Sequence, residues 1–219
     1  MTQGPAADPT AFILAQTAIA APPLVPEIKL HLATEITPIW EATEAMLTQM
    51  NLPPPYWAFA WAGGQALTRF LIDHPDWVKG KRVLDFAAGS GLSAIGAAKA
   101  GAALTQAAEI DDFAIAAIAL NARANNVAID LVREDLIGVE PRWDVVLAGD
   151  VCYERPMAEA ILPWLRSLAT KGDTVLMADP GRAYLPGAGL EPIARHVVPT
   201  SLELEDRRQR EVTIYRLLP

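Results

Sequence analysis

The sequence predicts an α/β fold whose sheet is mostly parallel and is completed by an antiparallel hairpin at the C-terminus. From Lys81 onward, short apolar runs alternate with segments of helical pattern, which is the order of strand–helix–strand units. A turn with two glycines, Gly89 and Gly91, follows the first apolar run. The chain then ends in two alternating segments, 201–205 and 211–217, which is the pattern of a hairpin.

Composition indicates the number of domains and the kind of partner. The 219 residues suit one substantial domain, which we place at 56–219, preceded by an N-terminal α/β extension at 1–55 that packs on it. A hydrophobic fraction of 52% is ample for a core. The formal net charge of −8 disfavours nucleic acid, because phosphate binding needs clustered Lys and Arg. It fits a positively charged group, such as a lysine on another protein.

Cysteine content and apolar run lengths exclude further classes. Cys152 is the only cysteine, so the chain has no internal disulfide and no zinc site built from cysteines. The three histidines show no metal-ligand spacing, and we expect no metal. No apolar run reaches the roughly 20 residues that cross a bilayer, and no basic residue precedes the first apolar run as in a secretory signal. We expect a cytoplasmic protein without a membrane partner, and a monomer.

The N-terminal extension is predicted to hold two helices and one strand. A short helix spans 10–21 and is broken by two prolines. Residues 27–32 alternate polar and apolar, as in a half-exposed strand. A threonine followed by proline then opens a second helix over 37–50, because a capping hydroxyl before a proline is a preferred helix start.

Residues 56–65 are rich in aromatic residues and glycine and lead into a helix over 66–73. Three large aromatic residues within this segment bury much area, so one interpretation is a core layer that covers the sheet. Two glycines before Gln65 also allow a ligand to approach the backbone and to meet a side-chain amide. A ligand wall is therefore the second interpretation.

The remaining elements follow in α/β order. We expect strands at 83–86, 104–110, 128–132, 143–149 and 174–178, and helices at 92–100, 113–125, 157–169 and 190–195. The second strand is poor by propensity because it carries Gln106 and several alanines. The helix over 157–169 contains Pro163, which is expected to bend it.

The glycine turn is the clearest candidate for a ligand site. Gly89 and Gly91 let the backbone turn tightly, and the next helix offers free N–H groups at its N-terminus. With Ala94 they match G-x-G-x-x-A, so an NAD-dependent oxidoreductase stays open. Asp85 favours another ligand, because a carboxylate there crowds the diphosphate of NAD but holds an ammonium group. S-Adenosylmethionine (SAM) carries such a group, and the stretch resembles the nucleotide-binding signature of Rossmann-like, SAM-dependent methyltransferases.

Carboxylates follow the second and third strands, at the edge where open α/β sheets bind ligands. Glu109 ends the second strand, about 20 residues after the glycine turn, where a carboxylate grips ribose hydroxyls. Asp111 and Asp112 compete for this role, and Asp112 equally suits the cap of the next helix. Asp135 lies where methyltransferases place an acid near adenine, with Leu136 as an apolar neighbour; a loop acid in solvent is the other interpretation.

The loop after the fourth strand carries Asp150, Tyr153 and Glu154, and in this fold it faces the transferable methyl group. A lysine has a pKa of about 10.4, so revealing its neutral amine at pH 7 costs roughly 4–5 kcal/mol. Asp150 and Glu154 are placed to bind the ammonium, and one of them takes its proton or passes it to water. Tyr153 is expected to orient the neutral amine and to cover the methyl group. Cys152 is expected to pack, because direct transfer needs no covalent nucleophile.

Three segments together narrow the resemblance. They are Pro55–Leu67, Val83–Gly91 and Gly149–Glu154. From about Val25 onward the chain resembles the electron transfer flavoprotein β-subunit lysine methyltransferases, which are seven-stranded, SAM-dependent protein-lysine methyltransferases. The glycine turn is common to a large superfamily, whereas the Trp-Ala-Gly-Gly-Gln segment and the Asp-Val-Cys-Tyr-Glu loop are more specific. The loop lacks the prolines of the Asn/Asp-Pro-Pro-Tyr motif of enzymes that methylate amides and nucleobase amines.

The resemblance implies a seven-stranded methyltransferase sheet and methylation of lysines in the flavoprotein β subunit, which modulates electron transfer from its dehydrogenase partners. It also implies two groups of site residues. SAM would be held by Asp85, Gly89, Gly91, Glu109 and Asp135, with Trp61 and Gln65 as neighbours. The lysine would meet Asp150, Tyr153 and Glu154. The same chemistry on a ribosomal protein and a catalytically silent SAM-binding module stay open as alternatives.

Overall fold

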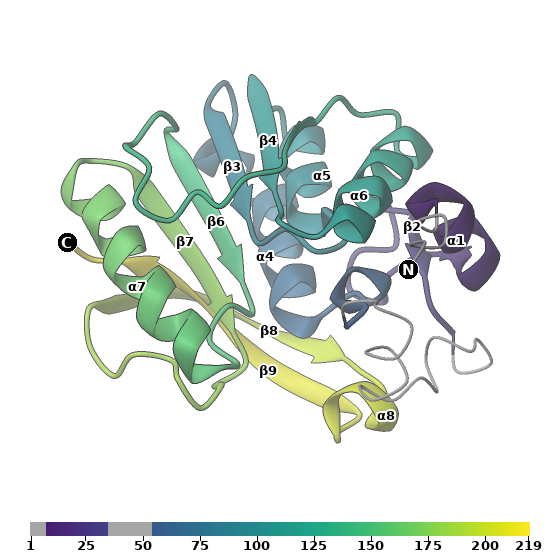
Figure 1. The fold of residues 1–219 in the computed structure, drawn as a ribbon. Helices are drawn as coiled ribbons and strands as arrows, with labels where there is room; N and C mark the ends of the chain where they lie inside the picture. Colours follow the sequence, from purple (N-terminus) through teal and green to yellow (C-terminus); the bar gives the residue numbers. More distant parts are fainter. Residues whose placement is uncertain (1–7, 35–53) are drawn as a thin grey trace, which may run out of the picture.

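Five parallel strands and an antiparallel pair at one side form a seven-stranded sheet in the computed structural model, which describes residues 8–34 and 54–219 (Figure 1). The strands are β3 (Arg82–Phe86), β4 (Leu104–Ala108), β5 (Asp130–Val132), β6 (Val145–Gly149), β7 (Thr174–Asp179), β8 (Leu190–Pro199) and β9 (Gln209–Leu217). Their order is β5-β4-β3-β6-β7-β9-β8. β9 runs antiparallel to β7, and β8 runs antiparallel to β9. The predicted fold class, a mostly parallel sheet closed by an antiparallel hairpin, is confirmed.

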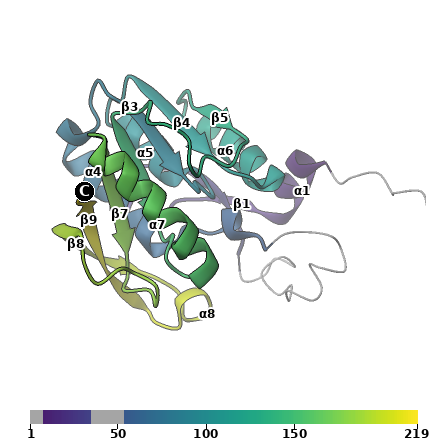
Figure 2. The ribbon, with the colours of Figure 1, turned by 60° about the vertical axis from the view of Figure 1, so that its left-hand side comes forward.

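Helices cover both faces of the sheet because successive strand residues point to opposite sides. The main helices are α4 (Ala62–Asp73), α5 (Leu92–Lys99), α6 (Asp112–Ala124) and α7 (Arg155–Thr170), with short 3-10 helices at Tyr56–Ala58 and Pro75–Trp77. Val145 of β6 packs in an apolar cluster with Leu67 of α4, whereas Val146 packs with Trp164 of α7. The sheet is therefore enclosed between α7 on one face and α4 and α5 on the other (Figures 1 and 2). None of the helices in the described ranges combines the length and apolar character needed to cross a membrane.

The first described segment forms α1 (Pro9–Gln16) and a two-stranded antiparallel sheet of β1 (Ala18–Ala20) and β2 (Leu30–Leu32). The predicted helix over 10–21 was too long. Thr17 adopts an extended backbone and its hydroxyl donates to the Ile13 carbonyl (2.6 Å), so the chain leaves the helix and pairs with β2. The predicted strand at 27–32 is confirmed in its second half. The helix predicted over 37–50 lies outside the described residues.

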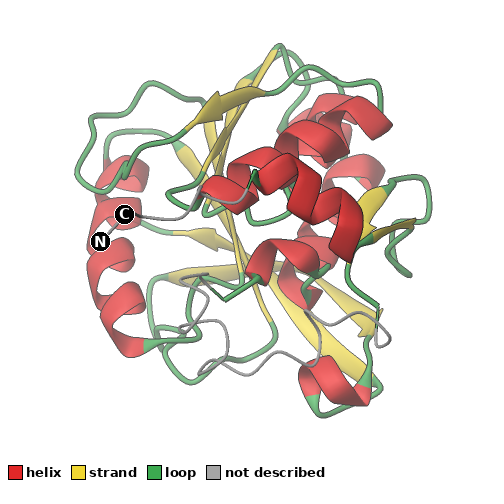
Figure 3. Ribbon diagram, turned by 45° about the vertical axis from the view of Figure 1, so that its right-hand side comes forward, coloured by secondary structure: helices red, strands yellow, loops and turns green. Residues whose placement is uncertain are grey.

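The C-terminal hairpin is present, but its first strand was predicted in the wrong place. Residues 190–195 were predicted as a helix and belong to β8, whereas 201–205 were predicted as a strand and contain the short helix α8 (Leu202–Glu205) between β8 and β9 (Figure 3). Pro192 is tolerated because β8 is an edge strand with an irregular register there. Ser201 caps α8 by accepting from the Leu204 N–H (3.2 Å), and Leu-Glu-Leu-Glu is a good helix former.

Candidate active site

A cavity of about 560 Å³ lies at the carboxyl ends of the parallel strands. Its size falls within the roughly 300–1,000 Å³ of small-molecule sites, and its place is the one that open α/β sheets use. Of the predicted site residues, Trp61, Gly89, Glu109, Asp135, Asp150 and Tyr153 line it. The others, Gln65, Asp85, Gly91, Leu136 and Glu154, lie outside its lining.

The glycine turn between β3 and α5 has the geometry that its sequence requires. Gly89 and Gly91 have φ of +53° and +75°, in the left-handed region that favours glycine. A Cβ at Gly91 would also lie 2.9 Å from the side chain of Ile118 on α6. Gly91 therefore lets α5 and α6 pack closely, while Gly89 borders the cavity.

Asp85 supports this turn from within the protein. Its side chain is buried, and its Oδ2 accepts from the Ala94 N–H (2.8 Å) in the first turn of α5. Gly91 stands at the N-cap of that helix without a side chain, so Asp85 supplies the missing acceptor. Burial raises the pKa of Asp85 to about 8, and the nearby charge of Glu109 adds to the rise.

Glu109 follows β4 and is joined to the glycine turn. Its Oε1 accepts from the Gly89 N–H (2.8 Å), and its Oε2 accepts from the Ile110 N–H (3.1 Å). A carboxylate offers about four acceptor positions, so ligand hydroxyls can still bind it. Burial raises its pKa.

The competing acids after β4 have other partners. Asp111 is the N-cap of α6 and accepts from the Phe113 N–H (2.9 Å), although it also borders the cavity. Asp112 forms an ion pair with Arg133. The suggestion that Asp112 caps this helix is therefore wrong, since Asp111 does.

The wall after β5 combines a carboxylate with an apolar side chain. Asp135 is exposed, lines the cavity, and accepts from the Ile137 N–H (3.0 Å). Leu136 is fully buried in the core beneath α7. The apolar neighbour that borders the cavity here is Ile137.

Asp150 is held firmly beside the cavity. It is buried and has a φ of +55°. Its Oδ2 accepts from the Gly63 N–H (2.5 Å) at the start of α4, and its Oδ1 lies 3.0 Å from Nη2 of Arg182. A Cβ at Gly63 would lie 2.4 Å from this Oδ2, so glycine is required there. α4 begins at Ala62, earlier than predicted, and this early start brings the Gly63 N–H to Asp150.

Aromatic rings form another part of the lining. Tyr153 has its ring centroid 5.5 Å from that of Tyr56, which in turn lies 6.1 Å from the Trp61 ring. Burial raises the pKa of Tyr153, so its hydroxyl keeps its proton at neutral pH. Trp57 is buried and stacks on Phe113 of α6. The aromatic segment therefore serves both predicted purposes, a core layer and a cavity wall.

Three other residues of interest have no part in the lining. The amide oxygen of Gln65 accepts from the Leu24 N–H (3.2 Å), and its nitrogen donates to the Ala60 carbonyl (2.7 Å), so both groups join main-chain segments. Glu154 is exposed at the start of α7. Cys152 is buried, and burial raises its pKa to about 12, which keeps it a thiol.

Sequence reasoning missed Arg182, which lines the cavity and contacts Asp150. It follows β7 by three residues. Polar residues after β4, β5 and β6 were selected because they follow strand ends. The same criterion applied to β7 would have selected Arg182.

Comparison with known proteins agrees with this geometry. The family model described as ribosomal protein L11 methyltransferase (PrmA) matches residues 57–152. The electron transfer flavoprotein beta subunit lysine methyltransferase of Xenopus laevis is 39% identical over 207 residues, which cover 93% of this chain and 82% of that protein. The human protein of the same name is 38% identical over 189 residues, covering 85% of this chain and 71% of that protein.

Solved structures share the fold at lower identity. Magnesium protoporphyrin IX methyltransferase (ChlM) from Synechocystis PCC 6803 with bound SAM has a TM-score of 0.54 and 14% identity, covering 98% of this chain and all of that chain. Ribosomal protein L11 methylase from Lactobacillus delbrueckii subsp. bulgaricus has a TM-score of 0.50 and 22% identity, covering 73% of this chain and 81% of that chain. At these identities the likeness shows the fold alone. The longer and closer matches show that the chain belongs to the electron transfer flavoprotein beta subunit lysine methyltransferase family.

Proposed function

We propose that this protein transfers methyl groups from SAM to lysine side chains of the electron transfer flavoprotein β subunit. One observation carries the proposal beyond family membership: Asp150 and Tyr153 line the same cavity as Gly89 and Glu109. Asp150 and Tyr153, which suit an amine, thus share one cavity with Gly89 and Glu109, which suit a nucleoside. The oxidoreductase interpretation is set aside because the relatives named above are methyltransferases.

The donor set fits SAM. Glu109 presents acceptor oxygens for ribose hydroxyls, and Asp135 presents a carboxylate for the amino group of adenine beside the apolar Ile137. The carboxylate of Glu109 accepts from the Gly89 N–H and lines the cavity, so this end of the site carries an acidic group that suits the cationic part of SAM. Glu109, Asp135 and Gly89 would therefore contact the cofactor, while Asp85 would act by holding the turn.

The chemistry follows from the side chains opposite. Bound SAM would supply a methyl group attached to a cationic sulfur. The leaving group is a neutral thioether, so its departure needs no general acid. The acceptor lysine must lose a proton first, and Asp150 accepts it or passes it to water. Tyr153 retains its hydroxyl proton and is placed to orient the neutral amine. Most of the acceleration is then expected from alignment of the amine with the methyl group.

Labelled SAM tests the proposal. Incubated with the enzyme and purified flavoprotein, it should label the β subunit on lysine, and methylated flavoprotein should accept electrons from its dehydrogenases more slowly. Ribosomal protein L11 belongs in a parallel incubation, because the L11 methyltransferase model matches residues 57–152. Label on L11 but not on the flavoprotein would overturn the substrate assignment. The monomeric state and the cytoplasmic location stay predictions.

A further inference from the structure

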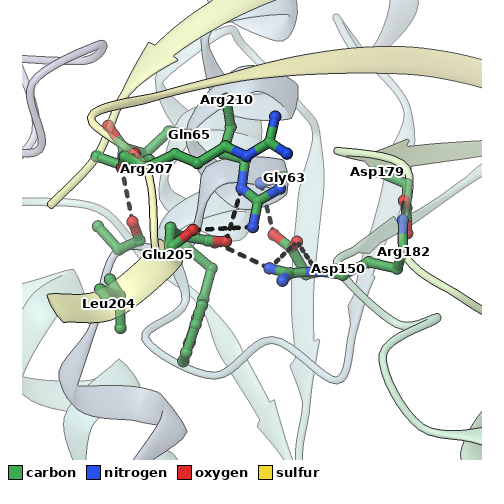
Figure 4. A network of polar contacts seen from close by, with 12 residues as sticks. Gly63, Gln65, Asp150, Asp179, Arg182, Leu204, Glu205, Arg207 and Arg210 are labelled. Atoms are coloured by element: carbon green, nitrogen blue, oxygen red, sulfur yellow. Dashed lines mark hydrogen bonds and ion pairs between the residues drawn. The ribbon is translucent and has the colours of Figure 1, made fainter. Parts of the chain in front are cut away.

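The guanidinium group of Arg182 joins Asp150 to Glu205, and the backbone N–H of Arg182 binds Asp179 (Figure 4). Its Nη2 and Nε lie 3.0 and 3.3 Å from Oδ1 of Asp150, on the loop after β6. The same Nη2 donates to Oε1 of Glu205 (2.9 Å), the last residue of α8. Its own backbone N–H donates to Oδ1 of Asp179, at the end of β7 (2.6 Å). The C-terminal hairpin is thus linked through Arg182 to the loop that carries Asp150.

Glu205 is built to hold Arg182 rather than to meet solvent. Its side chain is almost completely buried. Its Oε2 lies 3.3 Å from Nε of Arg210 on β9, and its carbonyl accepts from Nη2 of Arg210 (2.8 Å). Burying a carboxylate between two guanidinium groups costs desolvation free energy, so this cluster is weak evidence for a role in stability. A role in holding Arg182 against Asp150 accounts for it better.

Arg182 also borders the cavity itself. Its guanidinium carbon lies 6.0 Å from the centre of the Trp61 ring. The charged and titratable groups that face Asp150 are Arg182, Asp179, Glu205 and the thiol of Cys152. Arg182 is the one cation among them, and it opposes the effect of burial, which raises the pKa of Asp150 to about 6.

We propose that Arg182, anchored by Glu205, is a positioning residue for methyl transfer: it fixes the Asp150 carboxylate at the cavity and keeps it ionised for the incoming lysine. The inference rests on the proposed function. Without Arg182, the Gly63 N–H is the remaining bond described for this carboxylate, and two other acids lie nearby. Asp150 would then turn or take up a proton, and the lysine would lose its acceptor.

Kinetics of Arg182→Gln test the proposal, with Arg208→Gln as a control because Arg208 is an exposed arginine between α8, which carries Glu205, and β9. In Arg182→Gln we expect turnover at saturating flavoprotein to fall on the order of 10–100-fold. The acidic limb of the pH–rate profile should move up by about one pH unit. Affinity for S-adenosylhomocysteine, measured by calorimetry, should change little. Arg182→Lys should restore part of the turnover, since one ammonium can pair with Asp150.

The wild-type enzyme must first label the flavoprotein, so failure of the proposed function is seen separately. The positioning role is overturned if Arg182→Gln keeps wild-type turnover and pH profile, or if it gains turnover because Arg182 blocked the lysine. Parallel loss of melting temperature, cofactor affinity and turnover, without movement of the acidic limb, would show a structural role instead. If Arg182→Gln fails to fold, Glu205→Gln serves in its place, and a pH profile unchanged in that variant would equally overturn the role.

Discussion

Gly63 shows how a single hydrogen atom in place of a side chain sets the geometry of the site. Its N–H binds Oδ2 of Asp150 at the start of α4. An added Cβ would lie 2.4 Å from that oxygen and 2.6 Å from the Ala178 carbonyl, whereas a Cβ at Gly64 would have its nearest neighbour at 3.9 Å. The two adjacent glycines therefore form a matched pair for mutation.

Gly63→Ala is expected to lower the free energy of unfolding by about 1–3 kcal/mol, because backbone and a buried carboxylate must move. It should also lower turnover by displacing Asp150. Gly64→Ala should stabilise the helix by roughly 0.5–1 kcal/mol and keep turnover near the wild-type level. Urea unfolding and the methylation assay measure both. Equal effects of the two substitutions would show that the close approach at Gly63 is not needed.

The raised pKa of Asp85 predicts how the stability of the protein depends on pH. Its pKa is about 8 in the folded protein against an ordinary value of 3.8. Between these values the unfolded chain has lost a proton that the folded protein keeps, so this residue lowers stability as pH rises, by at most about 1.4 kcal/mol per pH unit.

Asp85→Asn keeps an acceptor for the Ala94 N–H and removes the titration. We expect its free energy of unfolding, relative to wild type, to increase as pH rises from about 5 to 8. Urea titrations across that range measure it, with Asp130→Asn on exposed β5 as the surface control. A difference from wild type that stays constant with pH would contradict the assignment.

At the scale of elements, two buried asparagines in and directly after α6 bind the N-terminal segment, and one of them also binds the glycine turn. Asn121 accepts from the His31 N–H (2.7 Å) and donates to the Ser90 carbonyl (2.9 Å), inside the turn. Asn125 accepts from the Lys29 N–H (3.0 Å) and donates to the Lys29 carbonyl (2.6 Å). Asn121 binds β2 and Asn125 binds the residue before β2, but of the pair only Asn121 also reaches the turn.

Alanine at either position is expected to destabilise the protein by about 1–3 kcal/mol for each buried group left without a partner. Asn121→Ala should in addition weaken binding of S-adenosylhomocysteine severalfold, whereas Asn125→Ala should not. Calorimetric titration of both variants at a temperature where they stay folded separates the two effects. Identical cofactor affinities would show that the link to Ser90 does not support the turn.

The elements also show what local sequence can reveal. The parallel strands and their helices were predictable because continuous apolar runs and helical periodicity agree with the final environment. Residues 190–195 were wrongly predicted as a helix. They form an edge strand because they pair with β9, and the local sequence does not encode this pairing. Residues 201–205 misled because alternating Leu and Glu over four residues suit either a strand or one helical turn, and the cap by Ser201 decided.

Part of the candidate site was predictable from polar and aromatic residues that follow strand ends, although Arg182 after β7 was missed. Glu109, Asp135, Asp150 and Tyr153 were found in this way, and all line the cavity. The contacts between distant segments were not predictable. The bond from Gly63 to Asp150 joins residues 87 positions apart, and no single-sequence pattern reports such a pairing.

For the molecule as a whole, the sheet brings two sets of groups to one cavity. Gly89 and Glu109 follow β3 and β4, while Asp150 and Tyr153 follow β6, which pairs with β3. The proposed cofactor site and the proposed amine site are therefore adjacent because the strands are neighbours. If the two groups divide the work in this way, substitutions on the two sides should have opposite effects on cofactor affinity and on turnover.

Affinity for S-adenosylhomocysteine and turnover on the flavoprotein, measured together for Glu109→Ala and Tyr153→Phe, distinguish the cofactor side of the cavity from the amine side. Glu109→Ala should weaken affinity about tenfold or more, because it removes charged acceptors of the ribose hydroxyls. Tyr153→Phe should leave affinity within about twofold and lower turnover on the order of 10–100-fold. Loss of cofactor affinity in Tyr153→Phe with turnover preserved at saturating cofactor would contradict the claim.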